Sequence, residues 1–462
     1  MSLWYNYHMK NILFINDAFI GGGLETRVIE QIKILKNHKI RPFLLCRELN
    51  EAYSKHFIAV SDALTLKSKH DVISARDIIK DVDNICNFCL ENKIDFIDCN
   101  PFWCALPATL AANKLQTPIS FTLHGKISAD FISKEYLTAQ ALYDTIFSYG
   151  FTQIFAVAEY LKDLYPHIPN IEIIRNGLPI NRLESQSFKN SKRIAIASRL
   201  DEPKTQIIID FLPKVYKSKA IEQIDIYGDG DHLPQLQDYI TKHQMADKVN
   251  LCGWAKNFPK ELNKKQYMLV FGMGRVVLEA IKSGVPVGIL GYSGFVGLVN
   301  RDNLLYFSRN NLTSWEEPHT DLSHELKLLF RKPNNYLFKS GQLSIFNVEK
   351  IWQGYYTIIN QLEYQDSDII KKIYDELLQN PDANILTDKE LFLTCVRLLS
   401  DGTHSISPRL FYNIFQNQFD QINSLSKEIS SLKETNAQLR EENSMSLNKI
   451  AKKRIISRIK KV

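Results

Sequence analysis

Short apolar runs rich in β-branched residues alternate with longer helical patterns over the first three quarters of the chain. This alternation predicts βαβ units whose largely parallel strands are covered by helices on both faces. We expect strands at 11–15, 42–46, 96–99, 119–124, 154–157 and 171–174, and a second series at 193–197, 223–227, 249–252, 268–271 and 285–290. The polar segment 181–192 separates the two series and is the predicted linker. The expected fold class is therefore α/β, with two Rossmann-like domains facing each other across a cleft, followed by a C-terminal helical extension and a coiled coil.

The C-terminal quarter carries helical patterns only. Apolar residues recur at helical spacing between 348 and 362, and a small helical segment follows the turn-rich stretch 379–384. A seven-residue repeat begins beyond Pro408. One seam position of the repeat holds Phe415, Ile422, Ile429, Asn436, Asn443 and Ile450, and the other holds Leu425, Leu432 and Leu439. Asparagine in the seam favours a parallel self-associating coiled coil; the alternative is a single helix that packs on its own body.

Length and composition indicate a folded protein of two or three domains. The chain has 462 residues, too many for one ordinary core, and its apolar content of 45% and charged content of 23% are typical of globular proteins. No apolar run approaches the ~18 residues of a membrane span, and the N-terminus lacks a signal-peptide pattern. We therefore expect a cytoplasmic protein, in which residues 1–8 are an upstream start or a disordered leader.

The positive charge is concentrated at the C-terminus. The net charge is +6, and residues 447–462 carry seven Lys or Arg and no acid, so the rest of the chain sums to 6 − 7 = −1. A body this close to neutral argues against a nucleic acid partner. Ile455, Ile459 and Val462 form one stripe among the basic residues of the tail. A basic amphipathic helix of this kind predicts binding to an anionic membrane surface; the alternative is a frayed, solvated end.

Two short motifs that suggest metal or redox chemistry lie inside one predicted helix. Cys86 and Cys89 form a C-x-x-C, but no second pair follows at zinc spacing, so we interpret the cysteines as buried thiols in a reducing compartment. Asp81 and Asp83 form the D-x-D of the chain and, being helical, are not expected to hold a metal-bound substrate.

Three glycine-containing segments could bind an anion. The first strand runs into Gly21, Gly22 and Gly23, where the backbone can approach a ligand at a helix N-terminus. The alternative is a structural turn, and the missing third glycine of the dinucleotide pattern argues against a Rossmann dehydrogenase.

Two further segments follow strands of the second series, one after the strand at 193–197 and one after the strand at 268–271. Arg199 and Lys204 follow the strand at 193–197 and could clamp a diphosphate, or could be solvated surface charges. Gly272 and Gly274 bracket a tight turn before a helix in which Arg275 and Glu279 share a face. The alternative for this last pair is an exposed ion pair of little energetic weight.

These segments arrive in the order and spacing of a known pattern, and the chain resembles the family-4 retaining glycosyltransferases of the GT-B fold, of the type found in bacterial surface-polysaccharide assembly. The resemblance spans about residues 9–362 and rests on several motifs together. In the first domain they are NILFINDAFIGGGLETRV, DFIDCNPFWCALPATLAANKLQTPISFTLHG, IFAVAEYLKDLY and IEIIRNGLPINRL. In the second they are SRLDEPK, IDIYGDGDHLPQLQDYI, KVNLCGWAKN and GMGRVVLEAIKSGVPV.

The resemblance implies a role for each motif. Gly22 and Gly23 would approach the donor phosphates or the acceptor, and Arg199 and Lys204 would neutralise the departing diphosphate. Glu279 would bind the donor's ribose.

The remaining implied roles concern the base and the reacting sugar. Gly253 and Trp254 would line the base pocket, and Gly272, Gly274 and Arg275 would belong to the donor site. His124 would lie across the cleft near the reacting sugar, although a histidine after a strand is otherwise often a structural residue.

The implied activity is transfer of a sugar from a nucleotide diphosphate to a hydroxyl of a glycan or lipid-linked glycan, with retention of configuration, as in lipopolysaccharide or capsule assembly. Cations and helix N-termini would stabilise the charge that develops on the diphosphate, so neither a metal nor a cofactor besides the donor is expected. Retention without a protein nucleophile would fit front-face attack. We expect a hexosyl or other glycosyltransferase.

The chain departs from the family at two positions. The family often pairs two glutamates eight positions apart; the second is Glu279, and Phe271 takes the place of the first, where the donor sugar should be held. Ala158 stands where a serine is common. The competing hypothesis is a catalytically silent nucleotide-sugar-binding scaffold that oligomerises at the membrane through its coiled coil.

The expected organisation has six parts. They are an acceptor-side Rossmann-like domain at 9–185, a nucleotide-sugar-binding Rossmann-like domain at 190–347, a helix returning to the first domain at 348–365, a helical extension at 366–408, a coiled coil at 409–446, and a basic amphipathic tail at 447–462. The coiled coil predicts a homo-oligomer. The tail favours a peripheral location on the inner face of the plasma membrane.

Overall fold

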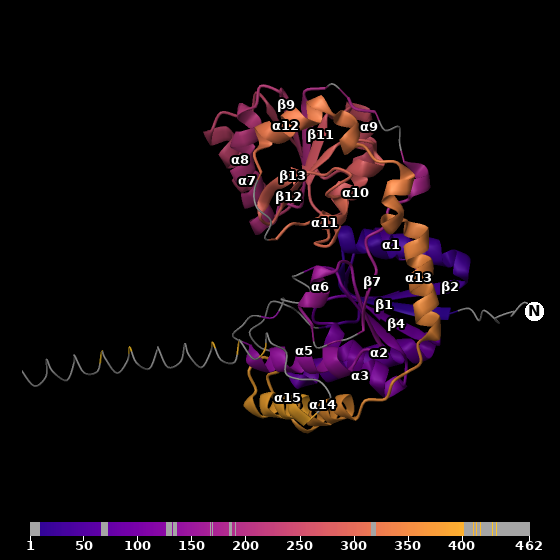
Figure 1. The fold of residues 1–462 in the computed structure, drawn as a ribbon. Coiled ribbons are helices and arrows are strands. Elements are labelled where there is room, and N and C mark those ends of the chain that lie inside the picture. The colour runs from indigo at the N-terminus through magenta and orange to yellow at the C-terminus, as the bar shows by residue number, and fades with distance from the viewer. Residues whose placement is uncertain are drawn as a thin grey trace, which may run out of the picture.

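The computed structural model describes residues 10–65, 73–125, 132, 136–166, 168, 170–183, 187–189, 191–315 and 320–401, together with 410, 413, 416, 427 and 431. Within these residues the chain forms two α/β domains, each built on one twisted sheet (Figure 1). The first sheet has seven parallel strands in the order β3-β2-β1-β4-β5-β6-β7. The second has six strands in the order β10-β9-β8-β11-β12-β13, all parallel except β13, which is antiparallel to β12. The predicted fold class of two Rossmann-like domains is confirmed.

The elements of the first domain follow one another along the chain. They are β1 (Lys10–Phe19), α1 (Gly23–Leu35), η1 (Lys36–His38), β2 (Ile40–Leu49), η2 (Glu51–His56), β3 (Val60–Ser61), α2 (Ala75–Asn92), β4 (Phe96–Cys99), α3 (Ala105–Leu115), β5 (Ile119–Leu123), α5 (Leu137–Tyr149), β6 (Gln153–Ala156), α6 (Tyr160–Asp163), β7 (Ile171–Ile173) and η3 (Ile180–Arg182).

The second domain and the C-terminal helices complete the described chain. They are β8 (Arg193–Ala197), α7 (Glu202–Lys217), β9 (Gln223–Tyr227), α8 (Leu233–Lys242), β10 (Val249–Gly253), α9 (Phe258–Lys265), β11 (Leu269–Gly272), α10 (Arg275–Lys282), β12 (Val287–Gly291), β13 (Gly294–Leu298), α11 (Leu304–Ser308), α12 (Leu322–Arg331), η4 (Pro333–Tyr336), η5 (Ser340–Phe346), α13 (Val348–Gln361), α14 (Asp368–Gln379) and α15 (Lys389–Asp401).

The eleven strands expected from the sequence all form, each within about two residues of the predicted ends, except that β1 and β2 are longer. Two strands were missed. β3 has two residues, too few for an apolar pattern, and β13 pairs antiparallel with β12 across a short turn, outside the βαβ alternation.

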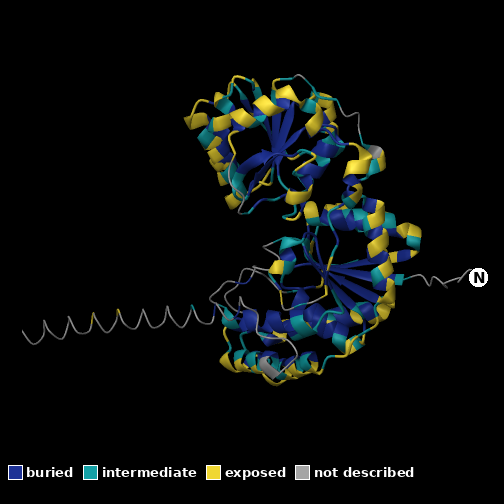
Figure 2. Cartoon of the chain, in the orientation of Figure 1, coloured by how far each residue is buried: buried dark blue, intermediate teal, exposed yellow. Residues whose placement is uncertain are grey.

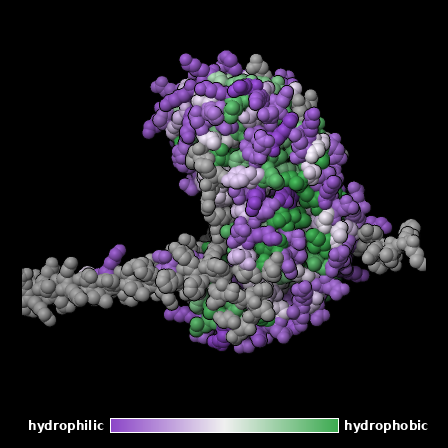
Figure 3. Space-filling model, in the orientation of Figure 1, coloured by the Kyte–Doolittle hydropathy of each residue, from purple (hydrophilic) through white to green (hydrophobic). Residues whose placement is uncertain are grey.

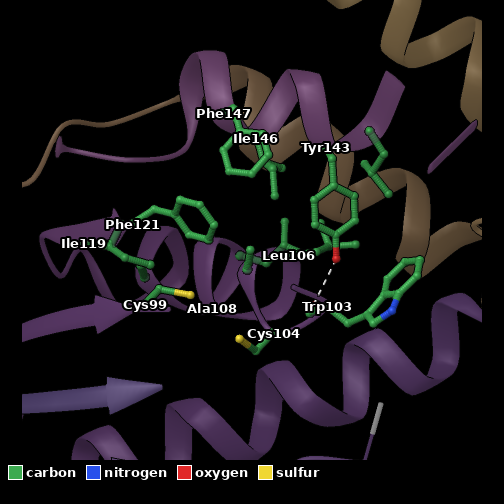
Figure 4. Close-up of a cluster of buried hydrophobic side chains, with 14 of the residues drawn as sticks. Cys99, Trp103, Cys104, Leu106, Ala108, Ile119, Phe121, Tyr143, Ile146 and Phe147 are labelled. Carbon is green, nitrogen blue, oxygen red and sulfur yellow. Dashed lines mark hydrogen bonds between the residues drawn. The ribbon is translucent and has the colours of Figure 1, made fainter. Parts of the chain in front are cut away.

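Both sheets are buried between helices, as their continuous apolar strands require (Figure 2). In the first domain α1 and α13 cover one face of the sheet, and α2, α3 and α5 cover the other. Figure 4 shows part of the second of these cores, where the Tyr143 hydroxyl donates to the backbone carbonyl of Trp103 at 3.0 Å. In the second domain α7, α8 and α12 pack on one face and α9, α10 and α11 on the other. Hydrophilic residues predominate on the outer helices of the second domain, at the top of the space-filling view (Figure 3).

The chain passes between the domains twice, at neighbouring places. Leu178 on the outward passage forms a bridge with Asn347 on the return, and a Cβ on Gly177 would lie 2.5 Å from Val348 Cγ2. The return passage leads into α13, which buries Trp352 and Tyr355 against the first domain. The side-by-side passages limit how far the two domains can separate.

The C-terminal helices extend the first domain. Helices α14 and α15 pack on α2, α3 and α5 (Figure 1). The predicted coiled coil at 409–446 and basic tail at 447–462 lie outside the described residues, apart from the five single positions named above. Of these, Leu410 belongs to the core of the first domain, and Asn413 Nδ2 donates to Gln140 Oε1 at 2.7 Å. The segment predicted as a coiled coil thus begins in contact with the first domain.

Candidate functional site

A cleft of about 770 Å³ lies between the two domains. The loops that follow β1, β5, β7, β8, β10 and β11 line it, so it occupies the carboxyl ends of the strands of both sheets, where open α/β sheets bind ligands. Of the predicted site residues, the cleft is lined by Gly22, Gly23, His124, Arg199, Lys204, Trp254, Gly274, Arg275 and Glu279. Gly253 and Gly272 are the two predicted residues that it leaves out.

The glycine triplet brings the N-terminus of α1 to the cleft. Gly21 has φ of 128°, a conformation that favours glycine, and a Cβ there would lie 3.2 Å from the Tyr53 hydroxyl. The N-cap of α1 is Gly22, which has no side chain with which to cap the helix. The first backbone N–H groups of α1 are therefore available to an anion in the cleft.

Arg199 and Lys204 meet at one carboxylate at the start of α7. The Arg199 guanidinium lies 3.3 Å from Asp201 Oδ2, and Lys204 Nζ donates to the same oxygen. The two cations differ in environment, because the Lys204 side chain is 11% exposed and that of Arg199 is 61% exposed. Burial and the neighbouring Arg199 lower the pKa of Lys204 against the opposing effect of Asp201. The site holds two cations with one internal counter-ion, so the pair carries net positive charge toward the cleft.

The N-terminus of α10 is a second helix end at the cleft. Gly274, the N-cap of α10, has φ of 57° and no side chain with which to cap the helix. Arg275 was expected, in the alternative interpretation, to pair with Glu279 on its own helix; instead its Nη1 lies 3.4 Å from Glu30 Oε2 on α1, across the domain boundary. Glu279 lines the cleft; its side-chain carboxylate forms no hydrogen bond or ion pair within the described part of the chain, and burial raises its pKa. Its carboxylate is thus free to accept hydrogen bonds from a ligand.

The end of the cleft near β10 is partly aromatic. Trp254 is 54% exposed and lines the cleft with Tyr227 and Phe258. Gly253 shapes this wall from behind: its φ is 66°, and its carbonyl accepts from the Gly228 N–H at 3.0 Å. An exposed tryptophan in a cleft offers a face on which a nucleobase can stack.

Gly272 is needed for packing, not for ligand contact. A Cβ at this position would lie 2.4 Å from Val276 Cγ1 and 2.9 Å from the Ala197 carbonyl oxygen. Gly272, which the resemblance assigned to the donor site, is not among the residues that line the cleft, and it allows α10 to approach the end of β8.

His124 closes the first-domain side of the cleft. Its Nε2 lies 2.8 Å from Asn100 Oδ1, and Asn100 Nδ2 donates to Asn16 Oδ1 at 3.4 Å. Since the Asn100 amide donates to Asn16, its oxygen accepts, which places the imidazole proton on Nε2. Burial, with a smaller effect of Arg27, lowers the pKa of His124 well below its ordinary value. The histidine is therefore neutral at physiological pH.

Phe271 does not lie where a sugar would be held. It belongs to β11, is fully buried, and packs in a T-shaped contact with Phe211 at 4.9 Å between ring centroids and another with Phe295 at 5.6 Å. The strand pleat points its side chain at α7, away from the cleft. The expectation that position 271 faces the donor sugar is corrected accordingly; Met273, two residues later, lines the cleft instead. Ala158 is also fully buried.

Several lining residues were not identified from the sequence. They are Thr26, Lys33, Asn176, Lys282, Met273 and Asn311. Asn176 could have been found, because it follows the predicted strand at 171–174. Asn311 has no such signal, because it comes from the irregular segment after α11.

The two motifs set aside in the first domain are structural. Cys86 and Cys89 are buried in the core of α2, and burial raises the pKa of both thiols. Asp81 accepts from Thr65, whereas Asp83 pairs with Lys114 on the surface. In the described parts of the chain no three His, Cys, Asp or Glu side chains are grouped so as to hold a metal ion, and no helix is long and apolar enough to cross a membrane.

Comparisons with known proteins identify the fold. No protein-family description and no curated protein sequence matches the chain. Among solved structures, sucrose-phosphate synthase from Thermosynechococcus elongatus is 13% identical with a TM-score of 0.58, covering 76% of this chain and 98% of its own. HepE from Anabaena, in complex with UDP, is 17% identical with a TM-score of 0.57, and the lipopolysaccharide outer core galactosyltransferase WaaB is 16% identical with a TM-score of 0.53; each comparison covers 76% of this chain and all of the other. The chain therefore shares the GT-B fold of these proteins.

Proposed function

We propose that this protein is a glycosyltransferase that moves a sugar from a nucleotide diphosphate sugar to a hydroxyl group. One observation carries the proposal: Arg199, Lys204 and the uncapped N-termini of α1 and α10 converge on a single cleft between the domains. These groups suit a diphosphate, whose negative charge grows as the glycosyl–phosphate bond breaks. The shared GT-B fold supports the same interpretation.

The donor is proposed to lie along the second domain. Its base would stack on Trp254, its ribose hydroxyls would donate to Glu279, and its diphosphate would meet Lys204, Arg199 and the N–H groups at Gly274. Gly22 and Gly23 would contact the phosphates or the acceptor from the opposite side. Uridine is the nucleoside we favour, because the structure of HepE contains UDP and because the base end of the cleft has no carboxylate among its lining residues to pair with a guanine N–H.

The transfer is proposed to retain the anomeric configuration. The acceptor oxygen would attack the anomeric carbon on the face from which the diphosphate leaves, and its proton would pass to the departing phosphate oxygen. Lys204, Arg199 and the two helix ends would stabilise the charge on that leaving group. We propose that these cations make a metal ion and any cofactor besides the donor unnecessary. Neutral His124, on the acceptor side, would hydrogen bond to the reacting sugar.

The acceptor is proposed to be a glycan or lipid-linked glycan in the assembly of a bacterial surface polysaccharide, at the inner face of the plasma membrane. The basic amphipathic tail at 447–462 supports a membrane-proximal acceptor, and a homo-oligomer through 409–446 would present several such tails together.

Deleting residues 447–462 should reduce binding to vesicles that contain anionic lipid and leave turnover on soluble acceptors unchanged. A chain that ends at residue 405 should lose self-association in sedimentation; an unchanged oligomer would remove the coiled-coil assignment.

Nucleotide release from a panel of donors tests the proposed function. The protein would be incubated with UDP-, GDP-, CMP- and dTDP-sugars, with and without acceptor extracts, and the free nucleotide would be measured. Release from one donor class that rises with acceptor supports the enzyme. No binding and no release for any donor would refute it.

The second candidate is a silent nucleotide-sugar-binding scaffold that oligomerises at the membrane. It is motivated by the scarcity of carboxylates in the cleft, since Glu279 is the one carboxylate among the described lining residues. Tight donor binding without turnover, even with acceptor extracts, would favour the scaffold.

A further inference from the structure

The segment at 309–314, here called the bridging loop, has an unusual backbone. Asn311, Leu312 and Ser314 have φ of 54°, 57° and 55°. Residues other than glycine in this region cost about 1–2 kcal/mol each, asparagine less than most, and they persist where surrounding contacts hold them. Three within four residues therefore indicate that contacts on both sides determine the shape of the loop.

On one side the bridging loop is hydrogen-bonded to the second-domain wall of the cleft, where the donor is proposed to bind. The Leu312 carbonyl accepts from the Gly274 N–H at 2.9 Å, directly before α10. The Thr313 carbonyl accepts from the Tyr292 N–H at 3.1 Å, and a Cβ on Gly291 would lie 1.8 Å from the same oxygen. Glycine at 291 is thus required for this close approach. The position of Gly274, and with it the start of α10, depends on the bridging loop.

On the other side the bridging loop contacts the first domain. The Arg309 carbonyl accepts from the Tyr160 N–H at 3.1 Å. Asn311 Oδ1 accepts from Asn176 Nδ2 at 3.0 Å, and Asn311 Nδ2 lies 3.5 Å from the His124 carbonyl oxygen as a long donor contact. In Figure 1, α11, which leads into this loop, lies at the edge of the second domain that faces α6 and α1. The Asn311 side chain therefore contacts the loops that follow β5 and β7, while the carbonyl of the next residue, Leu312, accepts from the Gly274 N–H before α10.

We propose that Asn311 is a positioning residue that sets His124 and the acceptor side relative to Gly274 and the donor diphosphate. The inference rests on the proposed function and names the device that aligns its two half-sites. Asparagine suits the position for two reasons: it tolerates positive φ, and its amide both donates and accepts. Because transfer needs acceptor and donor at reacting distance, loss of the amide should reduce turnover without weakening donor binding.

The experiment compares Asn311→Gly, Asn176→Ala and the double variant with the wild type. Glycine keeps the positive φ and removes only the amide. Gln266→Gly is the matched control, because Gln266 has φ of 52°, lies in the same domain and is not a lining residue of the cleft. The measurements are the Kd for UDP by calorimetry, kcat and KM for donor and acceptor, and the melting temperature.

The expected result is a loss of about tenfold in kcat for Asn311→Gly, which corresponds to about 1.4 kcal/mol, with the Kd for UDP within about twofold. The double variant should lose no more than the worse single variant, because both changes break the same contact. The Gln266→Gly control should match the wild type. Unchanged kcat in Asn311→Gly, fully multiplicative effects, or a rise in the UDP Kd that accounts for the lost rate would each overturn the positioning role.

Two additions keep the test decisive. If Asn311→Gly melts much earlier than the wild type, Asn311→Asp is the second variant, because it retains the oxygen that accepts from Asn176 and lacks the donor toward His124. A kcat equal to that of the wild type would then refute the role of the Nδ2 group.

Amide hydrogen exchange at Tyr160 measures, without turnover, the coupling between the donor site and the first domain. UDP should slow exchange at Tyr160 in the wild type but not in Asn311→Gly, while both show protection near Gly274; equal protection at Tyr160 in the two would refute the coupling. If the wild type binds UDP but turns over no donor, the proposed enzyme fails while the exchange measurement still decides the coupling.

Discussion

Lys204 is predicted to contribute more to diphosphate binding than Arg199, although an arginine fork is often the stronger phosphate ligand. The reason is burial. The Lys204 side chain is 11% exposed and that of Arg199 is 61% exposed, so water screens the arginine far more than the lysine. Two unit charges about 4 Å apart interact by about 1 kcal/mol in bulk water and by about 4 kcal/mol at an effective dielectric constant of about 20. Arg199 lies near the first limit and Lys204 nearer the second.

The internal counter-ion reduces the difference. Asp201 accepts from Lys204, so a phosphate would gain only part of the lysine's charge. We therefore expect Lys204→Ala to weaken UDP binding by about 2–3 kcal/mol, or about 30- to 150-fold in Kd, and Arg199→Ala by about 1 kcal/mol, or about fivefold. Part of the loss in Lys204→Ala should come from the Asp201 carboxylate, which would keep only the more exposed Arg199 as its counter-ion and would repel the diphosphate.

Calorimetry with UDP measures both changes. Lys214→Ala is the control, an exposed lysine on the same helix and outside the cleft lining, and it should leave the Kd unchanged. Adding Asp201→Asn to Lys204→Ala should restore part of the affinity, because the repulsion is removed. An Arg199→Ala loss equal to or greater than that of Lys204→Ala, or a Lys204→Ala Kd within about threefold of the wild type, would show that burial does not rank these two cations.

Three further predictions follow from the site. Burial raises the pKa of Glu279, so its ionised form disfavours the folded state above its ordinary pKa; Glu279→Gln should weaken UDP binding yet melt higher at pH 7.5, and the gain should shrink toward pH 4.5. Because burial lowers the pKa of His124, protonation disfavours the folded state; the wild type should lose melting temperature as pH falls below the ordinary histidine value of 6.5, and His124→Gln should lose less, a pattern that parallel pH curves would contradict. Phe271→Glu places a carboxylate in the core and should cost about 3 kcal/mol or more in the free energy of unfolding without improving donor binding; a variant that melts normally and binds donor more tightly would refute the assignment of Phe271 to the core.

Much of the fold was predictable because its signals are local. Strands such as β4, β8 and β9 begin and end at the residues expected, since a continuous apolar run bounded by polar turns needs no tertiary information to be recognised. Candidate site residues at the ends of these strands, among them Arg199 and His124, were found for the same reason: parallel sheets collect their strand ends at one edge. What failed was the expectation that position 271 faces the donor sugar, because the Phe271 side chain is buried against Phe211 and Phe295.

The sequence by itself determines that this protein forms two facing α/β domains and that glycines and cations stand at the carboxyl ends of their strands. Only the tertiary structure decided that the Phe271 side chain points away from the cleft, that Arg275 pairs with Glu30 on the other domain, and that Asn311 touches His124. Periodicity and turn chemistry act over a few residues, whereas these three outcomes depend on packing between segments far apart in the chain; Arg275 and Glu30 are 245 positions apart. Such contacts depend on how the two domains are placed against each other, and no short-range pattern encodes that placement.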